Sequence, residues 1–372
     1  MTAPIPTATR QMANQVVRLR VWGTDVIYPL LPRRHVAVLI GTSDACAVQL
    51  DDPLVAALHA QLVFDGSWWM TRTGPSHALL HDGVARERLV LAAGDEITIG
   101  ATTLIAESTR AARMRAFVQR LLGWGDDRLS AVDHALRAMR MAMGRRASLL
   151  ITADSEVVSV AHALHQHMHD DNAPFIVCNP GRRNGPATVR SPANLKSGAE
   201  AFGAAGGGSL CLLSWRLPHD VDEVMALACV PGSTVRVIVC VPRVHRSVAL
   251  AGMSSIEVPP LALREQELPR IVDEYADEAA AALGVIPSAF TDDDRNWIVK
   301  HASRSHLEIE KATRRLIALR TCQGVQKTAA RLGMAPVSLE RWLGRRPPLQ
   351  LARDVRISMA PPRRSGSKVM TA

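Results

Sequence analysis

The 372-residue sequence predicts a multidomain chain with three successive fold classes: an all-β sandwich, a parallel α/β sheet with a helical lid, and an all-α helix-turn-helix. Three observations predict this order: short strand-like runs, then strands alternating with helical segments, then two short helical segments around a glycine. The predicted segments are 16–106 for the sandwich, 107–127 for a helical linker, 128–260 for the α/β core, 261–320 for the lid, 321–346 for the helix-turn-helix and 347–372 for a flexible basic tail.

Residues 16–106 contain short apolar runs that are separated by turn residues, a spacing typical of a β-sandwich. The runs are VVRLRVW, HVAVLIG, HAQLVF, SWWMTR, ERLVLA and DEITIGATTLIA. Residues 107–146 then carry Ala, Arg, Leu and Met at helical spacing, including Ala131 to Met143, which predicts helices with residues 107–127 as a linker.

The stretch Ala147–Pro180 has the strand, turn, helix, strand order of a nucleotide-binding core. A phosphate-binding loop needs glycines, whose backbone N–H groups face the anion, and a lysine for the terminal phosphates. The loop Asp154-Ser155-Glu156 offers neither, and its two acids would repel a phosphate. We therefore predict a nucleotide-binding fold that no longer binds nucleotide and that holds no cofactor.

Pro259-Pro260 begins a region that is helical as far as residue 346. Within it, residues 328–343 read TAARLGMAPVSLERWL, with Gly333 as a left-handed turn residue between two short helices and Pro336 in the first turn of the second. This pattern is typical of a helix-turn-helix whose second helix enters the major groove, although an ordinary helical hairpin is the alternative. The predicted DNA-binding residues are Lys327, Val337, Ser338, Arg341, Arg345 and Arg346.

The positive charge of the chain is concentrated at its C-terminus. Residues 322–372 hold ten Lys/Arg and two Asp/Glu, so they carry +8 of the net charge of +9. Such a concentration is the electrostatic footprint of nucleic-acid binding, and a merely solvated tail is the alternative.

Residues 1–15 lack the layout of a signal peptide, no apolar run is long enough to span a bilayer, and the six cysteines occur singly. We therefore expect a cytoplasmic protein that does not contact a membrane and whose thiols are free and mostly buried.

Residues 18–106 resemble a forkhead-associated (FHA) domain. The motifs that carry the resemblance are Ile40-Gly41, Val48-Gln49-Leu50, His59-Ala60, Trp68-Trp69, Asp82-Gly83 and the turn from Gly94 to Gly100. The resemblance implies a domain that reads phosphothreonine peptides through loops at one end of the sandwich. The family's phosphate-reading positions hold Thr42, Ala56, Ala57 and His77 here, while the structural His59 is kept. Protein docking without phosphate is therefore favoured, and the candidate binding residues are Thr42, Arg72, Thr73, Ser76 and His77.

Residues 128–320 resemble the AAA+ ATPase of sigma-54 activators, and residues 322–346 resemble the Fis-type DNA-binding domain that follows it in that family. The resemblance is carried by the frame LLIT…VAHALH…PFIVCN, by GGSLCL, by VRVIVCVPR and by VPPLALREQELP. It implies a transcription regulator that binds DNA as a dimer. The catalytic positions depart from the family pattern. The position of the loop lysine falls near Val157, the two Walker B acids are replaced by Leu213 and Ser214, and Leu307 stands where the family has its sensor II arginine. The segment 179–206 is also too short for the loop that engages the sigma factor. We predict a pseudo-ATPase, not an enzyme.

His162, His165 and His169 fall on about one helical face and are followed by Asp170-Asp171. Imidazoles and carboxylates are good zinc ligands, but nothing in the sequence builds a second shell around them. We therefore favour a solvated helix end and predict no metal.

These observations predict a cytoplasmic bacterial transcription regulator whose partners are double-stranded DNA and a protein, phosphorylated or not, that docks on the FHA-like domain. We expect a homodimer or a higher oligomer. Two alternatives stay open: an ATP-dependent sigma-54 activator with an atypical nucleotide site, and an interaction scaffold that binds anionic partners without sequence preference.

Overall fold

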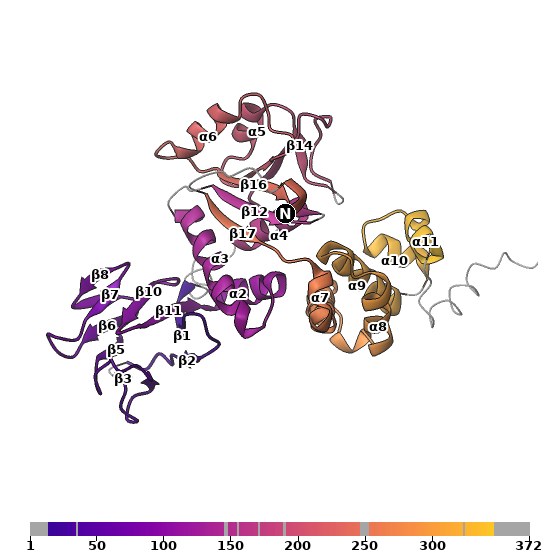
Figure 1. Cartoon of the computed structure of the whole chain (residues 1–372). Helices are drawn as coiled ribbons and strands as arrows, with labels where there is room; N and C mark the ends of the chain where they lie inside the picture. The colour runs from indigo at the N-terminus through magenta and orange to yellow at the C-terminus, as the bar shows by residue number, and fades with distance from the viewer. Residues whose placement is uncertain are drawn as a thin grey trace, which may run out of the picture. The chain divides into compact units, whose positions relative to one another are not determined.

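The computed structural model describes residues 14–34, 36–144, 148–154, 156–169, 172–188, 191–245, 253–322 and 324–345. The chain divides into two compact units, one that ends at Val258 and one that begins at Pro259, with Ala187–Pro192 counted with the second (Figure 1). Within the described residues, no helix combines the length and the apolar character needed to cross a membrane.

The first unit begins with a β-sandwich, as predicted. One sheet has the strand order β2-β1-β11-β10-β7-β8 and the other β4-β3-β5-β6-β9. Alternate residues of the strands point into a shared core that includes Leu19, Ile40, Leu62, Met70 and Ile97, because side chains on a strand alternate between its two faces. The strands are β1 (Val16–Val21), β2 (Ile27–Pro29), β3 (Val38–Gly41), β4 (Val48–Gln49), β5 (Ala60–Phe64), β6 (Trp68–Arg72), β7 (Leu79–His81), β8 (Val84–Arg86), β9 (Arg88–Val90), β10 (Glu96–Ile99) and β11 (Thr102–Ser108).

Two helices connect the sandwich to a parallel sheet. Helix α2 (Thr109–Leu122) begins at Ser108, whose side chain accepts a hydrogen bond from the Ala111 N–H group, and α3 (Asp126–Gly144) follows it. Such a serine cap satisfies a backbone donor that the first helical turn leaves unpaired. The helical spacing predicted over residues 107–146 is confirmed by α2 and α3, which together reach Gly144.

The parallel sheet has the strand order β14-β13-β15-β16-β12-β17. Its four central strands are mostly apolar because both faces are covered, one by α3 and α4 (Val157–Met168) and the other by α5 (Gly198–Ala204) and α6 (Val221–Cys229). The six strands are β12 (Leu149–Ala153), β13 (Phe175–Cys178), β14 (Ala193–Leu195), β15 (Ser209–Leu213), β16 (Arg236–Pro242) and β17 (Ser254–Glu257).

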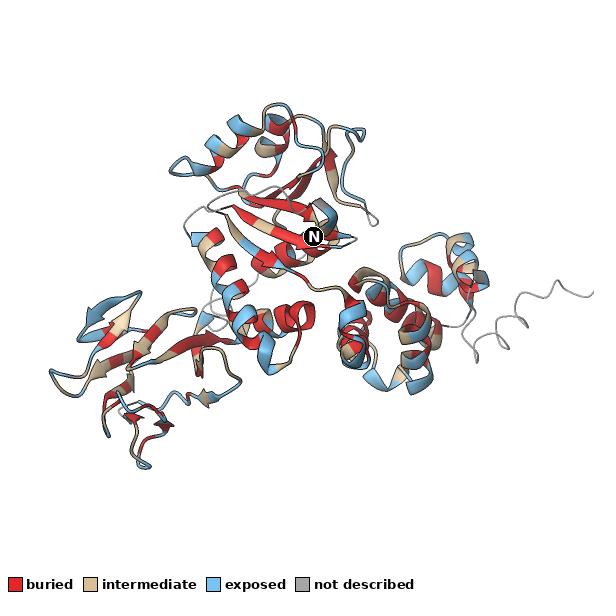
Figure 2. Cartoon of the chain, viewed as in Figure 1, coloured by how far each residue is buried: buried red, intermediate tan, exposed pale blue. Residues whose placement is uncertain are grey.

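The second unit consists of helices around one small core. Helices α7 (Leu268–Leu283), α8 (Asp292–His301) and α9 (His306–Thr321) are followed by the short helices α10 (Val325–Arg331) and α11 (Pro336–Arg345). Leu332, in the turn after α10, packs against a cluster of α7 and α9 residues that includes Ala276 and Ile317. The buried faces of these helices are turned toward one another (Figure 2). The turn between α10 and α11 is therefore joined to α7 and α9 through Leu332.

Candidate functional site

The turn between α10 and α11 is built as its sequence suggests. Gly333 has φ +64°, a left-handed conformation that a residue without a Cβ adopts freely, and the Met334 N–H group donates to the Ala329 carbonyl at 2.9 Å. Pro336 occupies the first position of α11, where its missing N–H group costs nothing. The turn thus fixes the direction in which α11 leaves α10.

One face of α11 is held by apolar and aromatic contacts. Leu339 is fully buried and Leu343 nearly so. The Trp342 ring meets the Trp297 ring of α8 edge-on at 5.5 Å, and the Arg315 guanidinium of α9 lies 5.1 Å from the centre of the Trp342 ring. Aromatic and cation–π contacts of this kind stabilise a packing by about 0.5–1.5 kcal/mol each. Helix α11 is therefore seated on α8 and α9 as well as on α10.

The opposite face of α11 is exposed. Val337 and Arg341 lie one helical turn apart on this face, and Lys327 on α10 is also exposed. Ser338 is only half exposed, and its N–H group donates to the Ala335 carbonyl at 2.9 Å. The structure describes the backbone of Arg345 at the end of α11, whereas Arg346 lies outside the described residues. Three of the six predicted residues thus present exposed side chains on this helix pair.

The predicted binding residues of the sandwich gather near His59, between strands β5 and β6 and their loops. His59 is buried; it accepts a hydrogen bond from the Ala56 N–H group at Nδ1 and pairs through Nε2 with the Ala78 carbonyl at 3.1 Å. The His77 ring stacks on it with 4.9 Å between ring centres. Burial lowers the pKa of His59, so that the neutral ring, with Nε2 as the donor, holds the two loops together.

Arg72, Thr73 and His77 are already engaged with the protein. The Thr73 hydroxyl donates to the Leu58 carbonyl at 2.6 Å and lies 3.0 Å from His77 Nδ1. Arg72 donates to the Pro75 carbonyl at 2.7 Å and forms an ion pair with the exposed Glu87. The Arg72 guanidinium would have to leave Glu87 before it could bind a phosphate group.

The two remaining candidates of this set have fewer contacts. Ser76 is exposed in the same loop as Thr73 and His77. The Thr42 N–H group donates to the Ala56 carbonyl at 3.1 Å, which ties the loop after β3 to the loop that precedes His59. Gly41 allows this close approach, because a Cβ at its position would lie 2.2 Å from the Ala57 carbonyl oxygen. The end of the sandwich is therefore a tightly joined set of loops.

The carboxyl edge of the parallel sheet carries an ion-pair cluster. Arg243, which follows β16, donates to Asp154 after β12 at 2.7 Å, forms an ion pair with Glu257 of β17, and donates to the Val258 carbonyl at 2.6 Å. Partial burial disfavours the charge of Arg243, but hydrogen bonds to Asp154 and Glu257 outweigh it and raise the pKa of Arg243. The connections that follow β12 and β16 run toward opposite edges of the sheet. In open α/β sheets, ligands bind in the crevice outside such a point.

The loop before α4 and the end of β15 lie at the same edge of the sheet. Helix α4 begins after Glu156, a residue with φ +66° whose side chain makes no capping hydrogen bond. At the end of β15, Leu213 is buried and the Ser214 hydroxyl is buried without a hydrogen-bond partner. No group of three potential metal ligands occurs among the described residues. The end of β15 therefore presents an apolar side chain and a hydroxyl where the sequence resemblance would place two acids.

The prediction of a solvated histidine-rich helix end is wrong for His165. Its side chain is buried, with Nδ1 2.9 Å from the Ser209 hydroxyl and Nε2 3.0 Å from the Ala173 carbonyl. Burial lowers the pKa of His165 to about 4. His169 Nε2 lies 3.1 Å from the same Ser209 hydroxyl, while His162 packs on Phe175 with 4.8 Å between ring centres. The histidines that share a helical face thus pack against β13 and β15, because this is the face with which α4 covers the sheet.

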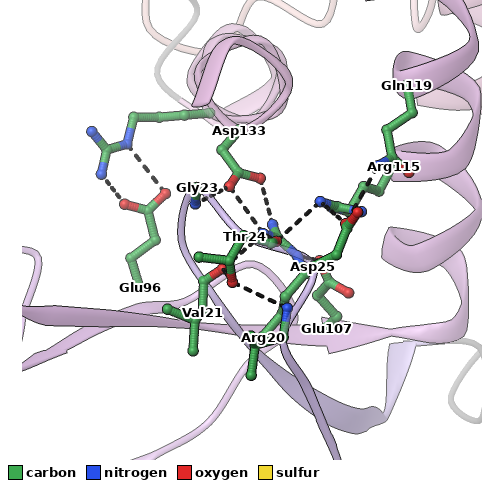
Figure 3. Close-up of polar contacts among 12 residues, drawn as sticks. Arg20, Val21, Gly23, Thr24, Asp25, Glu96, Glu107, Arg115, Gln119 and Asp133 are labelled. Atoms are coloured by element: carbon green, nitrogen blue, oxygen red, sulfur yellow. Dashed lines mark hydrogen bonds and ion pairs between the residues drawn. The ribbon is translucent and has the colours of Figure 1, made fainter. Parts of the chain in front are cut away.

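Sequence reasoning missed a buried ionic joint between the sandwich and α3. Arg20 of β1 is fully buried and donates from Nε to Glu107 of β11 at 2.8 Å and from Nη1 to Asp133 of α3 at 2.9 Å (Figure 3). The Gly23 N–H group also donates to Asp133, at 2.7 Å. Arg18 gives Glu107 a second partner at 2.7 Å. From Arg18 onward β1 pairs regularly with β11, so Leu19 points into the sandwich core and Arg20 points to the opposite face, which α3 covers.

A cavity of about 450 Å³ lies beside this joint, between the β7–β8 turn and α3. Arg137 and Arg140 of α3 both pair with Glu96 of β10 in its wall. Asp95, also in the wall, accepts a hydrogen bond from the Ala92 N–H group at 2.7 Å. These four charged groups of the wall are thus satisfied by the protein itself.

Comparison with known proteins identifies the N-terminal part. Residues 38–100 match the family model of the FHA domain. The chain contains an N-terminal FHA domain. No significant match to a curated protein was found.

Solved structures similar to the chain include several FHA domains. The FHA domain of the CT664 protein from Chlamydia trachomatis is 16% identical, with 24% of this chain and 95% of that chain covered and a TM-score of 0.22. FHA-1 of Mycobacterium tuberculosis Rv1747 is 19% identical over 26% of this chain and 99% of that chain, with a TM-score of 0.22. Mycobacterium tuberculosis EmbR in complex with a low-affinity phosphopeptide is 22% identical over 27% of this chain and 28% of that chain, with a TM-score of 0.25.

Proposed function

We propose that the chain is a DNA-binding transcriptional regulator in which the FHA domain contacts a protein partner. The observation that carries this proposal is the arrangement of α11. Its Leu339, Trp342 and Leu343 are occupied by packing, while Val337 and Arg341 stand on a face that is free to meet a groove. A helix whose outer face holds such side chains suits the major groove of DNA, which is wide enough to admit it.

The charge around α11 supports the same proposal. Lys327 and Arg341 are exposed, and Arg345 ends the helix. Arg331 donates to the Leu283 carbonyl at the end of α7, so it acts in packing rather than in phosphate binding. Glu340 is the single acid among residues 324–345. When such cations approach the DNA backbone, they displace the counterions that are condensed on the phosphates, and this release favours association.

For the α/β part we propose a pseudo-ATPase that serves as a scaffold. Arg243 occupies the carboxyl edge of the sheet with two carboxylates, so the crevice is closed by the protein's own charges. Leu213 and Ser214 supply no carboxylate that could bind magnesium or activate an attacking water. We propose no catalytic step for this part and no contact between it and a sigma-54 polymerase.

For the FHA domain we propose docking of a protein through the loops around His59. The FHA structures with which the chain was compared include one described in terms of phosphothreonine-dependent interactions. In this chain Arg72 is paired with Glu87, and Thr42 stands where the family has an arginine. This arrangement favours a partner that is recognised without phosphate, and titration with a phosphothreonine peptide and its unphosphorylated form separates the two cases.

The first experiment is selection of duplexes from a random library by the full-length chain at physiological salt. An enriched palindromic motif is expected, and Arg341→Ala should weaken binding to it by about 1–3 kcal/mol if Arg341 contacts a base. Arg270→Ala is the matched control, because Arg270 is an exposed arginine of α7. Arg270 lies thirteen residues before Leu283, or about 20 Å along the helix. Leu283 is the α7 residue whose carbonyl Arg331 of α10 contacts, so Arg270 is remote from that contact. Weak binding without sequence preference, equal in wild type and Arg341→Ala, would instead support an interaction scaffold.

A further inference from the structure

We propose that Val337 reads the methyl group of a thymine in the major groove, about two base steps from the base that Arg341 contacts. This inference rests on the proposed DNA binding and adds to it a base identity and a spacing. It assigns Val337 to direct readout, as a residue that determines specificity rather than one that only adds contact area.

The exposure of Val337 is unusual for its position. Its side chain is 60% exposed, and it is the one large apolar side chain that is exposed inside the described parts of helices α7, α8, α9, α10 and α11, whereas Ile286, at 71%, lies in the loop after α7. Single exposed apolar residues are common on protein surfaces, so exposure alone assigns no role. The next turn of the same face supplies the reason, because it carries the exposed Arg341. An apolar group one turn from an exposed cation suits a surface that meets the polar edge of one base and the apolar group of another.

The chemistry of the groove then limits what Val337 can read. Its isopropyl group neither donates nor accepts a hydrogen bond, and the thymine C5-methyl is the apolar group that base pairs display in the major groove. A β-branched side chain in a helix is held in essentially one rotamer, so contact costs little conformational entropy. Val337 is therefore pre-positioned for a methyl group, whereas it would leave the polar edge of any other base without a partner.

The helix geometry sets the spacing. Val337 and Arg341 are four residues apart, which corresponds to a rise of about 6 Å along α11. Successive bases on one strand are about 3.4 Å apart, so the two side chains reach bases about two steps apart if the helix follows the groove. Each half-site is therefore expected to contain a T and, about two steps away, the base contacted by Arg341, with guanine as the commonest partner of an arginine.

The test uses the duplex selected by the full-length protein and replaces each consensus thymine singly with deoxyuridine, which keeps the base pairing and lacks only the methyl group. One position per half-site should weaken wild-type binding by about 4-fold, the factor that corresponds to burial of one methyl-sized group. Val337→Ala should weaken binding to the thymine duplex by about 4-fold per half-site, so by about the square of that factor for a dimer, and should no longer distinguish thymine from uracil at that position. Alanine is a better helix former than valine, so α11 is expected to fold in the variant.

Three outcomes would overturn the inference. If wild type binds its motif but no thymine-to-uracil change has an effect, Val337 does not read a methyl group, although DNA binding stands. If Val337→Ala still distinguishes thymine from uracil but loses self-association in sedimentation velocity, the residue belongs to a protein interface. If wild type selects no motif at all, the inference fails together with the proposed function.

Discussion

Replacing Arg20 with methionine should destabilise the joint between the sandwich and α3. Methionine keeps most of the side-chain volume but removes the positive charge from between two carboxylates that are 0–3% exposed. Asp133 would keep only the Gly23 N–H bond, whereas Glu107 would keep Arg18. Removing one partner from a buried ion pair typically costs about 3–5 kcal/mol, and because Glu107 retains a cation we expect a value near the lower end, about 3 kcal/mol.

Hydrogen exchange read by mass spectrometry suits this measurement, because the chain has two compact units and need not unfold in one step. Peptides from β1, β11 and α3 should exchange faster in Arg20→Met, while peptides from α7–α9 in the second unit should be unchanged. Arg18→Met is the matched control: Arg18 pairs with the same Glu107 but is 25% exposed, so its loss should cost less than about 1 kcal/mol.

A second variant separates loss of the charge pair from loss of shape. In Arg20→Met/Asp133→Leu neither charge of that pair is left buried, so stability should recover by about 1–3 kcal/mol relative to Arg20→Met. If Arg20→Met exchanged like wild type, or if the two substitutions were simply additive, the joint would not depend on this ion pair and our reasoning would be refuted.

Two further predictions concern the α/β part. Because burial lowers the pKa of His165 to about 4 while the unfolded chain titrates near its ordinary value, the unfolded state binds more protons between these two values, so stability should fall as pH falls through that window. The loss of stability amounts to about 2 kcal/mol at pH 5 relative to pH 7.5. In His165→Gln, this part of the pH dependence of the unfolding free energy should disappear, as measured by urea unfolding of variant and wild type at both pH values. If the pH dependence were unchanged, His165 would not be its cause, and the neighbouring His162 and His169 would remain. Magnesium nucleotide should not raise the melting temperature of the full-length chain, because Arg243 and its carboxylates close the crevice; a saturable rise that Arg243→Ala abolished would instead favour the ATP-driven alternative.

The spacing of apolar residues along the sequence predicted the strands of both sheet regions, because each strand repeats the same pattern of buried and exposed positions. The alternation in residues 16–106 corresponds to a two-sheet sandwich, because each strand has one face on the core. Four apolar runs beyond residue 147 became buried strands of a parallel sheet, since both faces of that sheet are covered. The Gly333 turn followed from the φ value that it requires. In the candidate site, the same reasoning found the exposed Val337 and Arg341.

Contacts between distant segments could not be anticipated in this way. Helical spacing placed His165 on a face with His162 and His169, but it could not show that this face meets Ser209, 44 residues away. Arg20 is the stronger case, because Asp133 lies 113 residues further along the chain. Strand alternation correctly places Arg20 on the face opposite Leu19, but that pattern predicts a solvent-exposed arginine and cannot show that α3 covers this face. Burying a guanidinium is costly without partners, so Arg20 can lie under α3 only because Glu107 and Asp133 meet it there.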